Sequence, residues 1–494
     1  MVLLKKSPQW FLKRLSLHNP LIKWIVQINW IRVAILFSST LLTACALGPD
    51  YKRPVIEANE QFRMNLHEGV SIATLSWWEF LKDETLQQLI IEALVNNQDL
   101  KHAAALVQEY QARANVTRMD FLPNMDVQAN APFFGKLGGF PRAGFPTPFN
   151  YFGTTALNWE IDVWGRIRRA TEAARADILA QEENRRAIIL LLISAVAQTY
   201  FDLLQNDEQR NIALHALASW EESVAISRAQ LKVGLIPRID LDQFEAERAN
   251  AAALIAEFER LIVQKENELN VLLGRNPAPI PRKHSLAQQH IPPEVPAGLP
   301  SDLLQRRPDI LGAEQALAAA TARIGMTKAM RFPRFTITGM LGVASPALSN
   351  LLTFSDTKYG ASGIGLAAPL FNAQILGFEQ RAAEAQVDQA LASYNQTILI
   401  AFKEVENALI AIRTASEQRK ARQQQVEALQ SALYVADLRY KGGITSYVDV
   451  LLAKRNLYQA KFSHTDAHRL HLVSIVQLYK ALGGGWKPED EFKE

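Results

Sequence analysis

The sequence predicts an α+β membrane protein built from two copies of one half, each pairing β-strands with a long helical hairpin. A shift of 209 positions aligns about Thr154–Gly274 with about Gly363–Gly483 without a gap. Both copies open with alternating apolar and polar residues, and the first continues into about Arg166–Lys232, which contains no proline or glycine. So long a period indicates a duplicated half-molecule, not a short solenoid repeat.

The composition argues against several other classes of protein. The 53 Lys+Arg and 50 Asp+Glu residues nearly balance, and no basic stripe outside the N-terminus suggests nucleic-acid binding. Cys45 is the single cysteine, so an intrachain disulfide is impossible. No run of eighteen charge-free apolar residues follows Cys45, which argues against transmembrane helices.

Residues 1–44 are predicted to be a lipoprotein signal peptide. Basic residues precede the apolar stretch Val33–Ala44, which has the length of a signal h-region. Leu42-Thr43-Ala44-Cys45 resembles the bacterial lipobox, which predicts a covalent lipid on Cys45 and no other cofactor. The alternative is a buried cysteine in an ordinary signal peptide, and the leader's length leaves a later translation start open. Ala46 stands where Asp would favour inner-membrane retention, so the outer membrane is favoured.

Residues 45–120 are expected to hold the lipid anchor, a tether and two helices. Gly48–Pro54 is an extended, proline-fixed segment suited to a tether. Ser76 or Asp83 could cap the first helix, and the second covers about Gln98–Arg118.

Four strands of about ten residues are predicted, which is the length of a tilted transmembrane β-strand. Trp159 and Ile161 are expected to face lipid, and Glu160 and Asp162 to face the lumen or rim. A soluble sandwich edge or hairpin is the alternative. The alternating apolar residues are Met125, Val127 and Ala129; Leu157, Trp159, Ile161 and Val163; Phe335, Ile337, Gly339 and Leu341; and Ile364, Leu366 and Ala368.

A long helical hairpin follows each strand pair. The long first helix of the first hairpin could extend on the order of 100 Å. The returning helices, about Asp240–Leu273 and Val448–Leu482, end at Gly274 and Gly483, as expected for helix C-termini. The spacing of apolar residues suits lateral coiled-coil packing, with a soluble helical bundle as the alternative.

The chain divides into six segments on these grounds. They are the signal peptide 1–44, the anchor region 45–120, the first repeat 121–275, a Pro-rich connector and helix 276–330, the second repeat 331–484, and a polar tail 485–494.

One chain cannot form a closed membrane barrel alone. An open sheet edge leaves backbone groups unpaired in hydrocarbon, and four strands are fewer than the smallest known barrels. A symmetric assembly of several chains would close the sheet into a barrel and would give the long helices neighbours to pack against.

Several ordered motifs resemble the TolC/OprM group of outer-membrane efflux channels, nearest its OprM/NodT-like lipoprotein branch. The resemblance implies a homotrimer with a twelve-stranded β-barrel, four strands per chain, continuing into a periplasmic α-helical coiled-coil barrel. The motifs are Cys45–Pro54, Trp77–Asp83, Trp159–Arg166, Leu304–Ile310 with Ala313-Glu314, and Phe332–Phe335 with Thr338-Gly339.

The resemblance also implies a function. The chain would be the passive outer-membrane exit duct of a tripartite efflux system carrying drugs or other small molecules. Its partners would be a periplasmic adaptor (membrane fusion) protein, an inner-membrane pump of the RND type, and outer-membrane lipid. It would not be an enzyme. Alternatives are the exit duct of a type I protein-secretion system, or a lipid-anchored periplasmic scaffold without a pore.

The resemblance places a periplasmic gate at Tyr440, Asp449, Leu452 and Asp240. Tyr440 is expected to donate its hydroxyl to Asp240, and a ring of Asp449 would favour cations. Leu452 and Thr445 replace an Asp and an Arg of some members, which favours an apolar constriction over a salt-bridged lock. The alternative for Asp449 is a helix N-terminal acid.

The hairpin tips are the expected adaptor-docking positions, although plain turns are an equal alternative. No catalytic constellation stands out. His464, His468 and His471 could share a helix face, but without a carboxylate or cysteine no metal site is predicted. The tip residues are Gly234, Leu235, Ile236, Gly443, Ile444 and Thr445.

Overall fold

The computed structural model describes residues 46–56, 62, 82–130, 151–291, 300–345, 348–351, 353 and 357–484. The signal peptide with Cys45, Ser76, most of the Trp77–Asp83 motif and the polar tail therefore lie outside the described residues. The chain forms two compact units. One combines residues 1–51, 115–173 and 321–385, and the other combines 52–114, 174–320 and 386–494.

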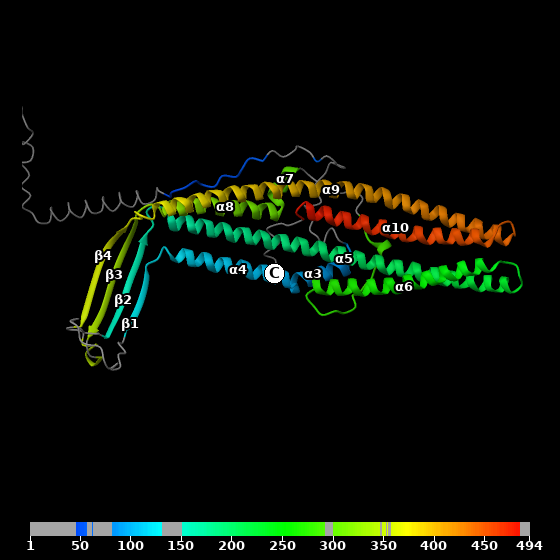
Figure 1. The fold of residues 1–494 in the computed structure, drawn as a ribbon, viewed down its shortest axis with the longest axis horizontal. Helices are drawn as coiled ribbons and strands as arrows, with labels where there is room; N and C mark the ends of the chain where they lie inside the picture. Colours follow the sequence, from blue (N-terminus) through cyan, green and yellow to red (C-terminus); the bar gives the residue numbers. More distant parts are fainter. Residues whose placement is uncertain are drawn as a thin grey trace, which may run out of the picture. The chain divides into compact units, whose positions relative to one another are not determined.

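The first unit contains one antiparallel sheet in the order β1-β2-β3-β4 (Figure 1). The strands are β1 (Asn124–Asn130), β2 (Tyr151–Ile161), β3 (Arg334–Ser345) and β4 (Lys358–Ala367). The four predicted strands are confirmed, but β1 has only 7 residues. Val163 and Ala368 lie beyond the ends of β2 and β4, because the chain leaves the sheet there to enter a helix.

The strand register sorts apolar and polar side chains onto opposite faces of the sheet. Trp159 pairs with Ile337, which pairs with Ile364. Residues paired across antiparallel strands share a face, so these side chains form one apolar row. The next row, Asn124, Asn158 and Thr338, is polar and exposed. The alternation predicted for single strands is therefore kept in these two rows, although the row of Ala156, Met340 and Ala361 on the polar face is apolar.

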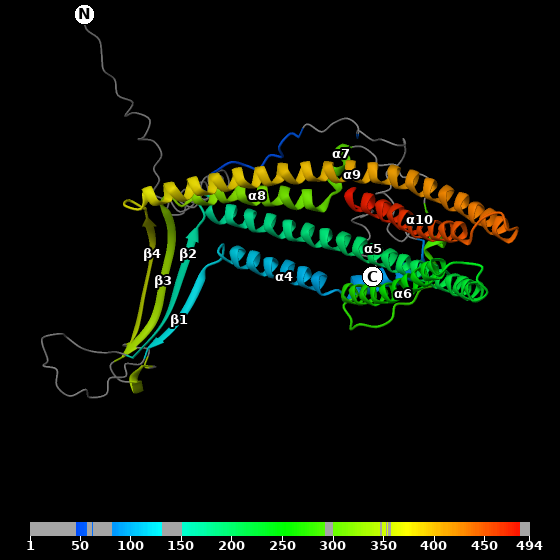
Figure 2. The same ribbon diagram turned by 45° about the vertical axis from the view of Figure 1, so that its right-hand side comes forward.

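Two helical hairpins follow the two strand pairs (Figure 2). The first comprises α5 (Arg166–Lys232) and α6 (Arg238–Leu272), and the second comprises α9 (Ala373–Lys441) and α10 (Tyr447–Ala481). The last residues of α5 and α9 are 209 positions apart, as are both ends of α6 and α10. The duplication read from the sequence is therefore present in the secondary structure.

Four shorter α-helices complete the described chain. They are α3 (Glu84–Asn96), α4 (Gln98–Met119), α7 (Pro300–Arg306) and α8 (Pro308–Ala329), with short 3-10 turns at Leu286–Gln288 and Leu348–Asn350. Asp83 caps α3 by accepting from the backbone N–H groups of Thr85 at 2.8 Å and Leu86 at 3.2 Å. Of the two candidate caps, the structure selects Asp83.

Hydropathy singles out one described helix as long and apolar enough to cross a membrane. This helix is α5, and 61% of its apolar stretch is buried. Buried core helices of soluble proteins pass the same test, so this stretch alone is weak evidence for a membrane span.

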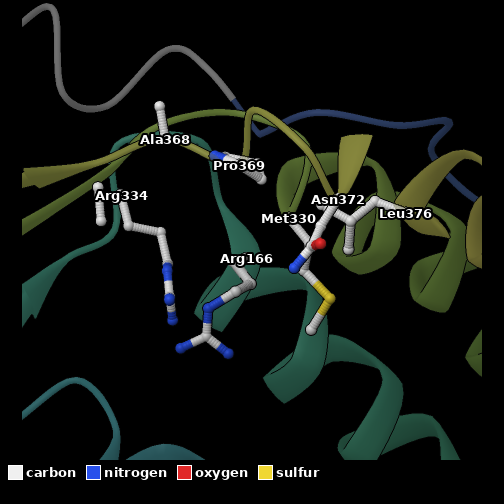
Figure 3. Close-up of a pocket in the computed structure, with 8 residues that line it drawn as sticks. Arg166, Met330, Arg334, Ala368, Pro369, Asn372 and Leu376 are labelled. Atoms are coloured by element: carbon white, nitrogen blue, oxygen red, sulfur yellow. The ribbon is translucent and has the colours of Figure 1, made fainter. Parts of the chain in front are cut away.

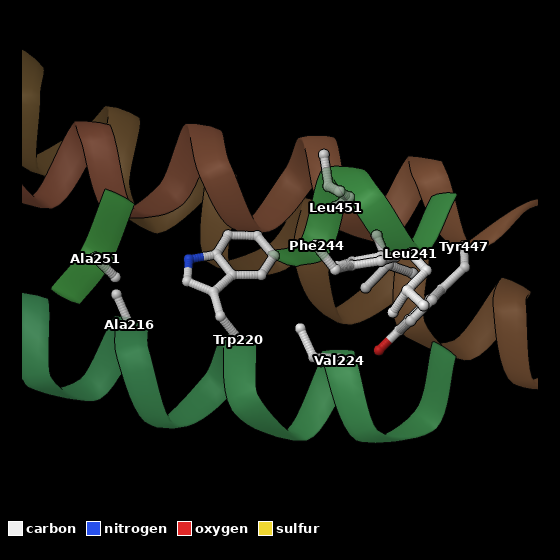
Figure 4. Packing of buried hydrophobic residues seen from close by; sticks show 9 residues of the cluster. Ala216, Trp220, Val224, Leu241, Phe244, Ala251, Tyr447 and Leu451 are labelled. Atoms are coloured by element: carbon white, nitrogen blue, oxygen red, sulfur yellow. The ribbon is translucent and has the colours of Figure 1, made fainter. Parts of the chain in front are cut away.

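The two hairpins share an apolar cluster near their tips (Figure 4). Phe244 of α6 is fully buried and its ring lies 4.6 Å from that of Tyr447 of α10. Trp220 of α5 lies 6.2 Å from Phe244, ring centre to ring centre. This burial holds the two hairpins together within one chain.

Candidate functional site

The polar face of the sheet is organised around a glycine. Gly342 of β3 stands in register between Thr154 of β2 and Tyr359 of β4. A Cβ atom at Gly342 would lie 2.7 Å from the Tyr359 ring, so only glycine lets the ring cross β3. The Tyr359 hydroxyl thereby reaches the Thr154 hydroxyl and forms a hydrogen bond. This polar contact lies on the face opposite to the apolar row of Trp159, Ile337 and Ile364.

Glu160 and Asp162 have structural partners where β2 meets α5. Asp162 accepts from the backbone N–H groups of Ile167 at 3.1 Å and Arg168 at 3.0 Å, which caps the helix. Arg166 forms a bidentate ion pair with Glu160, donating from its guanidinium nitrogens to the two carboxylate oxygens at 2.9 and 3.0 Å. That hydrogen bonding raises the pKa of Arg166. Neither acid is therefore a free charge on the polar face.

A cavity of about 460 Å³ lies at the same junction (Figure 3). The side chains of Arg166 and Arg334 extend into it side by side. Its lining contains no acid, histidine, cysteine or hydroxyl that could perform acid–base or nucleophilic chemistry. The lining residues are Arg166, Met330, Arg334, Ala367, Ala368, Pro369, Asn372 and Leu376.

The hairpin tips reverse through the same hydrogen-bond pattern. Leu235 donates its backbone N–H to Gln230 at 3.0 Å, and Ile444 donates to Arg439 at 2.9 Å. Gly234 and Gly443 have φ angles of 72° and 68°, the left-handed conformation that this helix ending requires. Both tips are therefore tight turns.

The tips also expose apolar side chains. Leu235 is 73% exposed and Ile444, its counterpart in the second half, is 69% exposed. Val233 and Ile239 are likewise exposed on the first tip. Ile236 and Thr445 are partly buried at the two turns. Each tip therefore offers an apolar contact in addition to its turn.

The predicted gate residues separate into two groups. Tyr440 stacks on Tyr447, with ring centres 4.5 Å apart, and its hydroxyl accepts a hydrogen bond from Gln230 of α5. The partner expected from the sequence was Asp240, so the structure corrects that pairing to Gln230. Asp240 instead lies in the first turn of α6, where the helix dipole favours an acid.

Asp449 and Leu452 lie on the opposite face of α10 from the packed residues. Asp449 is exposed in the first helical turn, and Leu452 is 40% exposed. Val450 and Leu451, between them, are buried against the first hairpin. Asp449 and Leu452 are therefore exposed, whereas Tyr440 is packed against the first hairpin.

A half-buried lysine joins the two hairpins below the tips. Lys454 of α10 donates to the Ser223 hydroxyl of α5 at 2.9 Å and lies 5.8 Å from the centre of the Trp220 ring. Burial lowers the pKa of Lys454. This polar contact lies beside the apolar cluster of the tips and adds specificity to the packing of the two hairpins.

The three histidines expected on one helix face, His464, His468 and His471, lie on α10 of the second hairpin. His468 and His471 are buried, and the pKa of each is lowered to about 4, first by burial and then by the positive charge of Arg419. Within the part of the chain that the structure describes, no group of three His, Cys, Asp or Glu side chains could hold a metal ion.

Sequence reasoning missed three residues that bind across the fold: Arg169, Gln230 and Lys454. Each is a polar residue within a helical pattern, and its binding partner cannot be identified until a second element is placed. Repeat comparison offers a signal for one of them, because Lys454 corresponds to the oppositely charged Glu245 in the first half.

Comparison with known proteins places this architecture. Residues 89–275 and 299–484 match the family described as outer membrane efflux protein. Over 453 residues the chain is 34% identical to the cation efflux system protein CusC of Escherichia coli, covering 90% of this chain and 97% of that protein. It is 33% identical over 451 residues to the probable outer membrane lipoprotein SilC of Salmonella typhimurium, with the same coverage.

A solved structure agrees with these sequence matches. The open state of the Neisseria gonorrhoeae MtrE outer membrane channel superposes with a TM-score of 0.81 at 30% identity. The alignment covers 90% of this chain and 99% of that channel.

Proposed function

Since the chain belongs to the outer membrane efflux protein family, we propose that three copies form a continuous duct with a twelve-stranded barrel and a helical barrel. Its function is that of an outer-membrane exit duct in a tripartite efflux system. It forms trimers and works with an adaptor and an inner-membrane pump. The observation that carries the proposed barrel is the two-faced sheet, which has β1 and β4 at its edges.

The sheet supports closure between chains. An apolar face suits lipid, and a polar face suits a water-filled lumen. In hydrocarbon the outer edges of β1 and β4 need partners, and pairing the β4 of one chain with the β1 of the next supplies them. Three chains with four strands each then give twelve strands. Purified protein should migrate as a heat-sensitive oligomer and conduct ions in planar bilayers; a non-conducting monomer would contradict the proposal.

The duplication identifies residue pairs for the helical interface between chains. Within the chain, Gln205 and Gln209 of α5 both donate to Asp466 of α10, the latter at 2.8 Å. Shifted by one repeat, these positions are Thr414 and Gln418 of α9 and Glu257 of α6. All three are exposed in the single chain. We therefore assign Thr414 and Gln418 to contact Glu257 of a neighbouring chain.

Disulfide trapping tests that contact. With Cys45 blocked by lipid, cysteines at Thr414 and Glu257 should link chains into dimers and trimers on oxidation. The matched control pairs Glu257 with Arg413, an exposed position about 100° round the helix from Thr414. Equal cross-linking of both pairs, or none of the first, would contradict the assigned interface.

The gate is proposed at the hairpin tips. Three copies of Asp449 and Leu452, both exposed in the single chain, would converge on the pore axis as a cation-favouring and an apolar ring. The Tyr440–Gln230 bond would hold the second hairpin on the first.

Single-channel recording tests the gate. Tyr440→Phe removes a bond worth about 0.5–1.5 kcal/mol, which should raise the open population several-fold. Tyr458→Phe is the matched control, since that hydroxyl donates to the His215 carbonyl farther from the tip. Asp449→Ala should weaken cation selectivity. If both gate variants conduct as the parent does, the gate lies elsewhere.

Lipidation of Cys45, docking of the adaptor on both tips and pairing with an RND-type pump complete the proposal. The exposed Leu235 and Ile444 support the docking surface, and the lipobox supports lipidation. Small molecules are the proposed cargo. Deleting the gene should sensitise cells to the substrates of the partner pump, and unchanged sensitivity would point to a different system.

A further inference from the structure

The segment that follows Cys45 lies bound against the folded chain. The backbone N–H of Leu47 donates to the Trp164 carbonyl at 3.1 Å. On its other side, Arg169 donates through Nε to the Leu47 carbonyl at 3.1 Å and through a terminal nitrogen to the Gly48 carbonyl at 3.3 Å. We call residues 46–50 the arm. Its backbone is held from two sides, unlike that of a free tether.

Arg169 is the centre of this contact. It is 4% exposed and also bonds to the Asp50 carboxylate at 2.7 Å and to Glu172 at 2.8 Å. One guanidinium therefore spans three acceptors on the arm, a geometry that the five donors of arginine allow and that lysine cannot match.

Glycines make the close approach possible. A Cβ at Gly325 of α8 would lie 2.6 Å from the Leu47 carbonyl oxygen, and one at Gly48 would lie 2.4 Å from the Gly325 Cα. A Cβ at Gly165 would lie 2.8 Å from the Ala46 Cα. Gly48 and Gly165 also have positive φ angles, of 98° and 80°. These close contacts at glycines therefore allow the arm to bind in one register only.

The second half of the repeat shows that the fold itself does not require the residues that bind the arm. The positions equivalent to Gly165 and Arg169 in the second half are Gln374 and Phe378, yet α9 forms just as α5 does. Gly165 and Arg169 therefore serve something that only the first half has, and the arm is that element.

We propose that Arg169 is a positioning residue for the lipid anchor, because it holds the arm so that the lipidated end is delivered beside the strand–helix junction. The inference rests on the proposed lipidation of Cys45. Cys45 directly precedes Ala46 in the sequence, so a bound arm would limit how far the lipid could lie from the junction. The arm is then bound in a fixed register, and this position sets where the acyl chains enter the membrane.

The mobility of the arm tests the proposal in the full-length, membrane-extracted trimer. Because lipid blocks Cys45, Pro49→Cys gives a single reactive thiol at an exposed arm position that can carry a nitroxide spin label. The label should be immobilised in the parent protein. Arg169→Gln should make the mobile component dominant, while Arg175→Gln, an exposed arginine on the same helix, should leave it minor.

A second variant separates positioning from folding. Gly325→Ala keeps every charge but places a methyl group against the Leu47 carbonyl, so it should also release the arm while trimers remain intact. A mobile label in the parent protein, or an immobile arm in both variants, would overturn the proposal. So would loss of trimers in Arg169→Gln together with an immobile arm in Gly325→Ala. Labelled palmitate incorporation reports separately on whether Cys45 is lipidated at all.

Discussion

Acid should destabilise the second hairpin through His468 and His471. The pKa of each is about 4 in the folded chain, against 6.5 for an ordinary histidine. The unfolded chain therefore binds more protons between these values, and the free energy of unfolding falls as pH falls. The loss is absent above about pH 6.5, grows below it and is complete below about pH 4. Arg419 and Lys420 of α9 add to the cost of protonation.

The magnitude follows from the shift. A difference of one pKa unit corresponds to about 1.36 kcal/mol, so each histidine costs about 2 kcal/mol at pH 5 and about 3 kcal/mol at pH 4. Both side chains are less than a tenth exposed, which leaves little screening by solvent. Together they should lower the free energy of unfolding by about 4 kcal/mol between pH 7.5 and pH 5, if they titrate independently.

This loss in the free energy of unfolding can be measured by denaturant unfolding in detergent at both pH values, with the helices followed by circular dichroism. The double variant His468→Gln/His471→Gln should lose about 4 kcal/mol less than the parent protein, whatever its stability at neutral pH. His102→Gln is the control, since this histidine is exposed on α4. Parallel pH dependence in the parent and the double variant would refute the reasoning.

Three further predictions concern the other parts of the duct. Cys45→Ser should abolish incorporation of labelled palmitate, and equal labelling of the variant would contradict lipidation. A cysteine at Asn158 should react with a membrane-impermeant maleimide in the assembled channel while one at Ile337 is spared; the reverse pattern would exchange the two faces of the sheet. Leu235→Asp with Ile444→Asp should abolish cross-linking to the adaptor and leave trimers intact, whereas unchanged cross-linking would exclude the tips as the docking surface.

The long elements were predictable because their signals are local. Period-2 alternation identifies the strands, and the ends of α5, α6 and α10 lie within two residues of those expected. Glycines with positive φ end the helices as expected, because no other residue adopts that conformation as readily.

Contacts between distant helices could not be predicted in the same way. Tyr440 was singled out, but its partner Gln230 depends on the rotation of α5 against α9, which a single helix does not encode. Arg169 looks like one more surface charge until the arm is placed on it. Glu160 and Asp162 fit the alternation of a lumen face, yet their partners belong to α5, which begins only after the strand ends.

The duplication has an evolutionary consequence. In a ring of identical single hairpins, every interface would be the same, and any substitution would act at all of them at once. A fused pair removes that restriction, because interfaces within and between chains can then diverge. The half-buried contact between Lys454 and Ser223 illustrates this freedom. The equivalent positions in the other half are Glu245, which pairs with Arg228 inside its own hairpin, and Ala432. The duplicated chain thus allows contacts within chains to change without altering contacts between chains.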